Sequence, residues 1–270
     1  MPAIQPARLR QQAALLAESF HEPESFLRSL HHLMEFYADR AHRPGRSGTP
    51  APLLPAYHVR PPVLRQLWLE LAPHAREDPQ AALRLCSALW DHGYQETRLL
   101  AIHLLGVIPV QDPDFILGKV NEWLGAKSDL LLVDAMLEHG FAGLRGSCPG
   151  VLLEQIEKWL QSDRQHEQRY GLRALLPFIR DPEFENMPVI FRLVTPYCRV
   201  IPSAGLRPDI LDIIAALARR SPPETSFFLR ELLYTPESPD TPWLVRNSLK
   251  SFPVQQQSSL RSKLREIERL

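Results

Sequence analysis

Apolar side chains recur along this chain at the spacing of helices, and one stretch carries the same pattern twice. The first copy covers residues 115–136 and the second covers residues 151–172. In each copy apolar residues stand at positions i, i+1, i+5, i+8 and i+9, which share one face of a helix and do not alternate as in a strand. The equivalent tryptophans, Trp123 and Trp159, are 159 − 123 = 36 residues apart. A second apolar helix follows each copy after a short polar break.

A helix pair that recurs at such a period is typical of stacked α-hairpins, in which each unit buries its apolar face against its neighbours. HEAT-type repeats have a similar period of ~40–47 residues. We therefore predict an all-α fold, an α-solenoid of HEAT-like helical hairpin repeats that curves around a concave groove. The prediction treats residues 1–270 as one such domain.

Further helices are predicted from the same spacing on both sides of the two copies. They cover residues 6–20, 23–41, 62–76, 79–91, 95–107, 187–200, 208–220, 223–233, 241–252 and 254–270. Pro196 predicts a kink or an early stop near residues 194–195. The five tryptophans fall at helical core positions, where they fill the interior more often than they stack on bases.

Residues 42–62 are too rich in Pro, Gly, Ser and Arg to hold a helix, so we predict a loop between helices. The segment is either a surface loop or a basic finger that touches phosphates through Arg43 and Arg46. The surface loop is the expected interpretation.

The charge of the chain limits the classes of partner. It has 31 basic and 31 acidic residues, so its formal net charge is zero. A dedicated non-specific DNA binder would be more basic, because phosphate contacts supply most of that affinity. Residues 77–160 hold twelve acidic and six basic residues, a balance of −6.

Cysteine usage and hydropathy suggest a reduced, non-membrane protein. The three cysteines are far apart and form no CxxC pair, so we expect neither a zinc site nor a disulfide framework. The N-terminus has no apolar core of the signal-peptide type, and no apolar run is long enough to cross a bilayer. We expect a cytoplasmic monomer without metal or cofactor. The phosphate-loop, dinucleotide, serine-hydrolase and metalloprotease motifs are all missing from the sequence.

Three segments, in order, resemble the DNA alkylation-repair family of AlkD type, which are HEAT-like-repeat DNA glycosylases. Residues 56–67 match an early segment of that family, although a histidine replaces its glycine; residues 89–105 match a Leu-Trp pair followed by a Glu-led helix; residues 127–136 match the segment with the family's aspartate. A Gln-Arg pair follows. The matching residues are Val59, Pro62, Arg65, Leu89, Trp90, Asp91, Glu96, Ala101, Lys127, Ser128, Val133, Asp134, Gln168 and Arg169, with His58 in place of the glycine.

The resemblance implies roles for three of these residues. Asp134 would act on the positive charge that develops on the sugar, and Arg169 with Lys127 would grip the DNA backbone. Two aromatic positions of the family are not kept. Leu130 stands at one, and Ile213 or Ile214 at the other, so the means of enclosing a cationic base by cation–π contact is lost. The alternative is that Asp134 is an ordinary helix aspartate that faces solvent or pairs with an arginine.

Spacing adds two cationic pairs. Arg169 and Arg173 are at i and i+4 on a predicted helix, as are Arg246 and Lys250, so each pair shares a face. They could contact phosphates. Alternatively, Arg169 and Arg173 could pair with Asp134, Glu138 or Glu167.

Two functions follow from the sequence. The first is a protein that binds double-stranded DNA and perhaps excises alkylated purines as an N-glycosylase. The second is a non-enzymatic scaffold that binds a protein or peptide in the same groove.

Overall fold

A computed structural model describes residues 5–39, 54–125, 129–235 and 237–267 of the chain. In these ranges the regular elements are all helices and no strand occurs. The all-α prediction is confirmed, whereas the curvature of a solenoid and its groove remain predictions. The chain divides into two compact units, Met1–Val151 and Leu152–Leu270.

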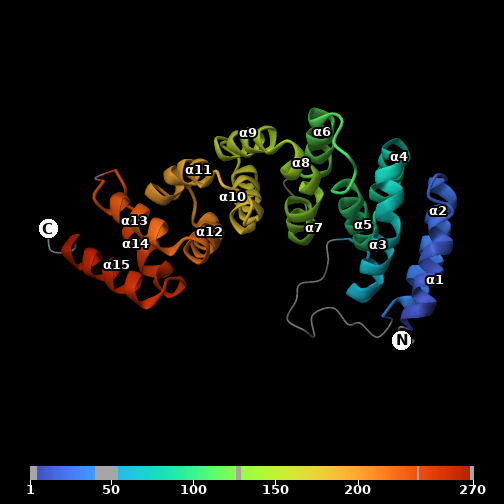
Figure 1. Cartoon of the computed structure of the whole chain (residues 1–270), viewed down its shortest axis with the longest axis horizontal. Coiled ribbons are helices and arrows are strands. Elements are labelled where there is room, and N and C mark those ends of the chain that lie inside the picture. The colour runs from blue at the N-terminus through green and yellow to red at the C-terminus, as the bar shows by residue number, and fades with distance from the viewer. Residues whose placement is uncertain (1–4, 40–53, 126–128, 236, 268–270) are drawn as a thin grey trace. The chain divides into compact units, whose positions relative to one another are not determined.

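Figure 1 labels the helices along the chain. Those of the first unit are α1 (Pro6–Ala17), α2 (Pro23–Tyr37), α3 (Pro61–Glu77), α4 (Pro79–Asp91), α5 (Gln95–Leu105), α6 (Pro113–Trp123), α7 (Leu130–Ala135), the π-helix η1 (Met136–Gly140) and α8 (Ala142–Ser147). The division between the units falls within α9 (Pro149–Leu160). The second unit continues with α10 (Gln165–Arg180), α11 (Met187–Arg199), the 3-10 helix η2 (Ala204–Leu206), α12 (Arg207–Arg220), α13 (Pro222–Leu233), α14 (Thr241–Ser248), the 3-10 helix η3 (Leu249–Ser251) and α15 (Val254–Ile267).

Prolines and aspartates decide where many of these helices begin. A proline occupies one of the first two positions of α3, α4, α6, α11 and α12, among others, where its missing N–H costs no helical hydrogen bond. The carboxylates of Asp78, Asp112 and Asp129 accept N–H groups at the starts of α4, α6 and α7, at 2.9, 3.1 and 2.9 Å. This is why a proline-rich chain can be mostly helical.

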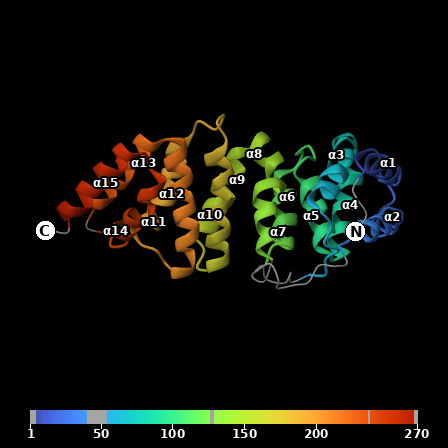
Figure 2. The same cartoon turned by 90° about the horizontal axis from the view of Figure 1, so that it is seen from below.

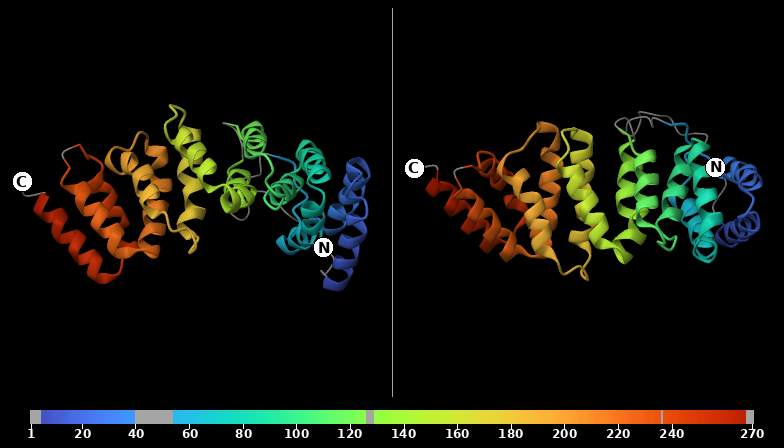
Figure 3. Two further views of the ribbon diagram at one scale, coloured as in Figure 1. Left: turned by 45° about the horizontal axis from the view of Figure 1, so that its top comes forward. Right: turned by 90° about the horizontal axis from the view of Figure 1, so that it is seen from above.

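Within each unit, alternate helices pack against each other. In the first unit α5 contacts α3 on one side and α7 on the other. In the second, α12 contacts both α10 and α14, and α10 lies beside α12 in Figure 2 and in both views of Figure 3. The apolar cores lie between these helices, which is the packing expected of helical hairpins.

The two copies of the sequence pattern form equivalent helices, α6 and α9. Their matching tryptophans are buried, with Trp123 6% and Trp159 5% exposed. Trp123 stacks on Trp90 at a ring-centroid distance of 4.5 Å. The prediction that tryptophans fill the core is confirmed for these three, while Trp68 and Trp243 are only half-buried.

Of the two effects predicted for Pro196, an early stop near residues 194–195 is wrong, because α11 continues through the proline to Arg199, and a kink stays a prediction. The proline lies in the last turn, so it removes only one backbone donor near the end of the helix. Its own carbonyl still accepts the N–H of Val200 at 3.0 Å. Over the described ranges, no helix combines the length and the hydropathy needed to cross a membrane.

Candidate functional site

Asp134 lies near the end of α7 and is half-buried. The π-helix η1 follows α7 directly, and such segments are frequent at functional sites. A glycine holds this segment close to α5, because a Cβ atom on Gly106 would come within 1.8 Å of the carbonyl oxygen of His139. The close packing of η1 on α5 therefore requires glycine at position 106.

The surroundings of Asp134 on α7 are apolar. Leu130 and Leu131 are 54% and 48% exposed, so a leucine side chain faces solvent at the position where the resemblance implies an aromatic ring. Ile213 and Ile214, the other replaced position, are buried at 1% and 0% exposure. Both side chains belong to the buried face of α12. Lys127 lies outside the described residues.

Arg169 and Arg173 of α10 reach the same carboxylate. Arg169 Nε donates to Asp209 Oδ2 at 3.1 Å, and Arg173 Nη1 donates to Asp209 Oδ1 at 2.8 Å. Arg169 Nη2 also donates to the carbonyl of Gly205 at 2.7 Å. The side chain of Asp209 is 4% exposed, whereas those of Arg169 and Arg173 are 30% and 26% exposed. The predicted common face is confirmed. We refer to Arg169, Arg173 and Asp209 as the arginine cluster.

Sequence reasoning missed Asp209. It lies forty residues from Arg169, in the first turn of α12, where a carboxylate also interacts favourably with the positive end of the helix dipole. The only sequence signal was an acidic residue directly after Pro208 at a helix start. Nothing in the sequence says that this carboxylate is buried or that two arginines approach it.

Arg246 and Lys250 are both exposed. The helix that was predicted to carry both ends between them, since α14 stops at Ser248 and Lys250 lies in the following 3-10 helix. Their roles as phosphate contacts remain predictions, as do those of the arginine cluster and Asp134.

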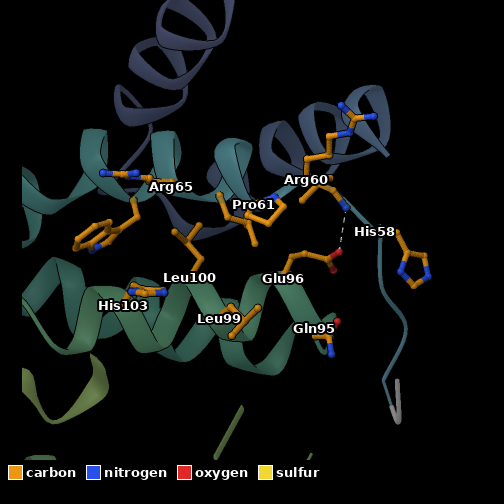
Figure 4. A pocket seen from close by; sticks show the side chains of 12 residues that line it. His58, Arg60, Pro61, Arg65, Gln95, Glu96, Leu99, Leu100 and His103 are labelled. Atoms are coloured by element: carbon orange, nitrogen blue, oxygen red, sulfur yellow. Dashed lines mark hydrogen bonds between the residues drawn. The ribbon is translucent and has the colours of Figure 1, made fainter. Parts of the chain in front are cut away.

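A cleft of about 760 Å³ lies between α3 and α5, and we call it the α3–α5 cleft. It is lined by residues of the first two segments that carry the family resemblance, among them Val59, Arg65 and Glu96. Figure 4 shows the side chains of both helices facing each other across it, with His103 toward the C-terminal end of α5. Its lining otherwise consists of His58, Arg60, Pro61, Leu64, Trp68, Gln95, Leu99, Leu100 and His103.

Glu96 closes one end of the cleft and is 4% exposed. Its carboxylate accepts the backbone N–H groups of Tyr57 at 3.0 Å and Val59 at 3.3 Å. His58, between them, has a φ of 56°, the one positive φ of a non-glycine residue in the described part of the chain. The position where the related family has a glycine thus has a backbone conformation that favours glycine, and it turns two amides toward one carboxylate.

Burial also shifts the pKa of a histidine that lines this cleft, His103. It lowers the pKa of His103 to about 4, with a further contribution from the neighbouring His139, whose ring stacks on it at 4.4 Å. The described ranges contain no group of three or more His, Cys, Asp or Glu side chains placed to hold a metal ion.

Comparison with known proteins identifies the family. The profile described as DNA alkylation repair enzyme matches residues 39–199, well over half of the chain. Searches of curated proteins and of solved structures each found no match. The matched range contains the α3–α5 cleft, Asp134, Arg169 and Arg173, and it ends before Asp209, Arg246 and Lys250. The chain therefore belongs to the DNA alkylation repair enzyme family.

Proposed function

We propose that this protein binds double-stranded DNA through the sugar-phosphate backbone and that Asp134 promotes release of an alkylated base from the sugar. Membership of a DNA-repair family supports a role of this kind. The observation that carries the proposal is the arginine cluster, in which one buried carboxylate contacts two partly exposed guanidinium groups.

The cluster suits phosphate because its cations are held in place before a ligand arrives. A guanidinium presents five N–H donors in a fixed fork, which matches the oxygens of a phosphate. The bonds of Arg169 to Asp209 and Gly205 use Nε and Nη2. Its Nη1 makes no hydrogen bond within the described ranges, so it can donate to a phosphate oxygen without breaking the existing contacts.

Asp134 supplies the chemical part of the proposal. Cleavage of the bond between an alkylated purine and deoxyribose develops positive charge on the sugar, and a nearby carboxylate stabilises that charge in the transition state. A purine alkylated at N3 or N7 already carries a positive charge, so it leaves as a neutral base without a proton donor, and water then adds to the sugar carbon. Asp134, half-buried and two residues before the π-helix that packs against α5, is the carboxylate we assign to this step.

A second candidate function has its own observation. Leu130 and Leu131 are large apolar side chains that lie next to each other and are about half exposed. Neighbouring exposed apolar groups are typical of surfaces that bind proteins or peptides. A scaffold without catalytic activity would use this face of α7 and would not need Asp134.

Base release tests the reaction. Wild type and Asp134→Asn would be incubated with duplex DNA that carries a cationic alkylated purine, and the free base would be quantified. Asp114→Asn is the matched control, since Asp114 is an exposed aspartate in the first turn of α6. We expect release by wild type and by the control, and a loss of at least ~100-fold in Asp134→Asn. Equal release by all three would exclude a role for Asp134.

Salt-dependent binding tests the DNA contact independently. The logarithm of the binding constant should fall with the logarithm of salt concentration, with a slope of about −0.9 for each phosphate contact. Arg169→Gln should reduce the magnitude of that slope by about one unit. Arg192→Gln is the control, because Arg192 is an exposed arginine that pairs with Glu157 instead of a buried group. Binding that ignores salt, or no binding at all, would reject DNA and favour the scaffold.

A further inference from the structure

We propose that the α3–α5 cleft binds a nucleotide, with the base between the rings and aliphatic side chains of α3 and α5 and the phosphate at Arg60. This goes beyond the proposed function. None of the residues involved belongs to the arginine cluster or to α7, so the two proposals can fail separately.

The size and floor of the cleft fit a flat organic ligand. Its volume of about 760 Å³ falls within the ~300–1,000 Å³ that is usual for small-molecule sites. Leu64, Leu99 and Leu100 form an aliphatic surface between the helices. Such a surface accepts the apolar faces of a purine or pyrimidine, whose polar atoms lie on the ring edge.

Two ring side chains at one end of the cleft supply what the edge of a base requires. Trp68 and His103 both line the cleft, and their ring centroids are 5.2 Å apart. The indole Nε1 of Trp68 is buried and has no hydrogen-bond partner within the described ranges. Such a donor needs an acceptor, and a base offers ring nitrogens and carbonyl oxygens. Because burial lowers the pKa of His103 to about 4, its imidazole is neutral at neutral pH and offers one donor and one acceptor.

The other end of the cleft carries one cation. Arg60 is exposed, and its side chain makes no ion pair or hydrogen bond within the described ranges. Figure 4 shows its guanidinium group turned away from Glu96, the carboxylate of the lining, which accepts the backbone amides of Tyr57 and Val59. The guanidinium group of Arg65 lies at the same end of the cleft as His103.

The dipole of α5 adds to this positive potential. Its first residue, Gln95, lines the cleft, and the helix is longer than two turns, so its N-terminal end favours an anion. α3 begins with Pro61 and Pro62, which have no N–H group to offer. A ligand that is anionic at one end and aromatic at the other satisfies both ends of the cleft. An acidic peptide would satisfy only the cationic end.

The indole N–H resonance of Trp68 provides a local readout of binding. It would be identified in the proton–nitrogen spectrum by its loss in Trp68→Phe, and then followed during titration with 2′-deoxyguanosine 5′-monophosphate. We expect saturable displacement of this resonance with a Kd of ~1 mM or tighter. Deoxyguanosine should bind at least ~10-fold more weakly, and inorganic phosphate alone should leave the resonance in place.

An arginine variant tests the phosphate end. Arg60→Gln should weaken binding of the nucleotide by ~3–10-fold. Arg76→Gln is the control, since Arg76 is exposed on α3 and does not line the cleft. Arg169→Gln and Asp134→Asn should bind the nucleotide as wild type does, which separates this proposal from the one above.

A single-stranded DNA hexamer identifies the source of the nucleotide. Competition with the mononucleotide would assign the cleft to an unpaired nucleotide of a strand, and its absence would assign it to free nucleotides. The proposal is overturned if ~10 mM nucleotide leaves the Trp68 resonance unmoved. It is also overturned if deoxyguanosine binds as strongly as the nucleotide and Arg60→Gln binds the nucleotide as strongly as wild type does. Tighter displacement by an acidic peptide would also overturn it, in favour of a peptide site.

Discussion

Two buried carboxylates, one in each unit, are held in opposite ways. Glu96 and Asp209 are both 4% exposed, and each stands in the first turn of its helix. Glu96 accepts two backbone amides from the segment that precedes α3. Asp209 accepts two guanidinium groups from α10. Burial of a charge requires such partners, because an unpaired carboxylate in a protein interior is strongly unfavourable.

The kind of partner decides what each carboxylate can do for function. Backbone amides are neutral and fixed by the chain, so Glu96 defines the path of residues 57–59 and leaves no cation at the surface. Guanidinium groups are charged and partly exposed, so Asp209 positions two cations that a ligand can reach. The same degree of burial therefore marks a structural contact in one unit and a candidate binding surface in the other.

Removing the carboxylate of Asp209 should have the largest effect. Asp209→Ala leaves two partly buried arginines without their common partner, and loss of one member of a buried pair costs ~3–5 kcal/mol. Chemical denaturation would measure the free energy of unfolding. Asp212→Ala, an exposed aspartate of the same helix, should stay within ~0.5 kcal/mol of wild type.

Glu96→Gln should cost less and should leave DNA binding intact. A carboxamide keeps one acceptor oxygen but turns an NH₂ group toward the second backbone donor, so we expect a loss of ~1–3 kcal/mol. Glu77→Gln, at an exposed position, is the control. If Glu96→Gln also reduced the salt slope of DNA binding, the distinction between a structural and a ligand-facing carboxylate would fail.

The sequence was sufficient to predict the helices, but it did not predict the different partners of Glu96 and Asp209. Apolar spacing and helix-starting prolines depend on neighbours within a few residues, which is why α4 was predicted with its observed bounds, residues 79–91. Asp209 meets Arg169 across forty residues, and such a contact has no local pattern. The α3–α5 cleft was missed for the same reason, although its lining residues Arg65 and Glu96 had been noted from the family resemblance.

Prediction from the local sequence also failed at Pro196 and His58, where the energetic cost of the residue was small or was offset by other contacts. Pro196 was expected to kink its helix or to end it early, but it lies in the last turn and the helix continues to Arg199. His58 was noted only as a replacement for a glycine. In the structure His58 has a positive φ, and the hydrogen bonds that Tyr57 and Val59 donate to Glu96 hold this conformation.

Lowering the pH should destabilise the first unit more than the second, because the first unit contains His103. Its pKa is lowered by burial to about 4 in the folded protein, compared with ~6.5 in the unfolded chain. The unfolded state therefore binds more protons between these values, so stability is complete above about pH 6.5 and falls as the pH approaches 4. His92, whose pKa burial also lowers, acts in the same direction.

The contribution of His103 should be on the order of 1–2 kcal/mol, reduced from the full linkage value because the ring is only partly buried. Hydrogen exchange between pH 6.5 and 4 should show protection lost in α5 before α12. His103→Gln should flatten this dependence. An equal loss of protection in both helices would place the acid-sensitive group elsewhere.

The smallest expected effect concerns the residue that Glu96 holds in a strained conformation. At a φ of 56°, glycine avoids a steric cost of ~1 kcal/mol that any residue with a Cβ atom incurs. His58→Gly should therefore be more stable than His58→Ala by about that amount, although glycine is the more flexible residue in the unfolded chain. Both variants lose the imidazole, so its contacts cancel from the difference. At His21, which lies in a turn without positive φ, alanine should be the more stable of the two. If alanine were the more stable variant at His58 as well, the amides of Tyr57 and Val59 would reach Glu96 without strain at His58. Glu96 and Asp209 would then differ only in the charge of their partners.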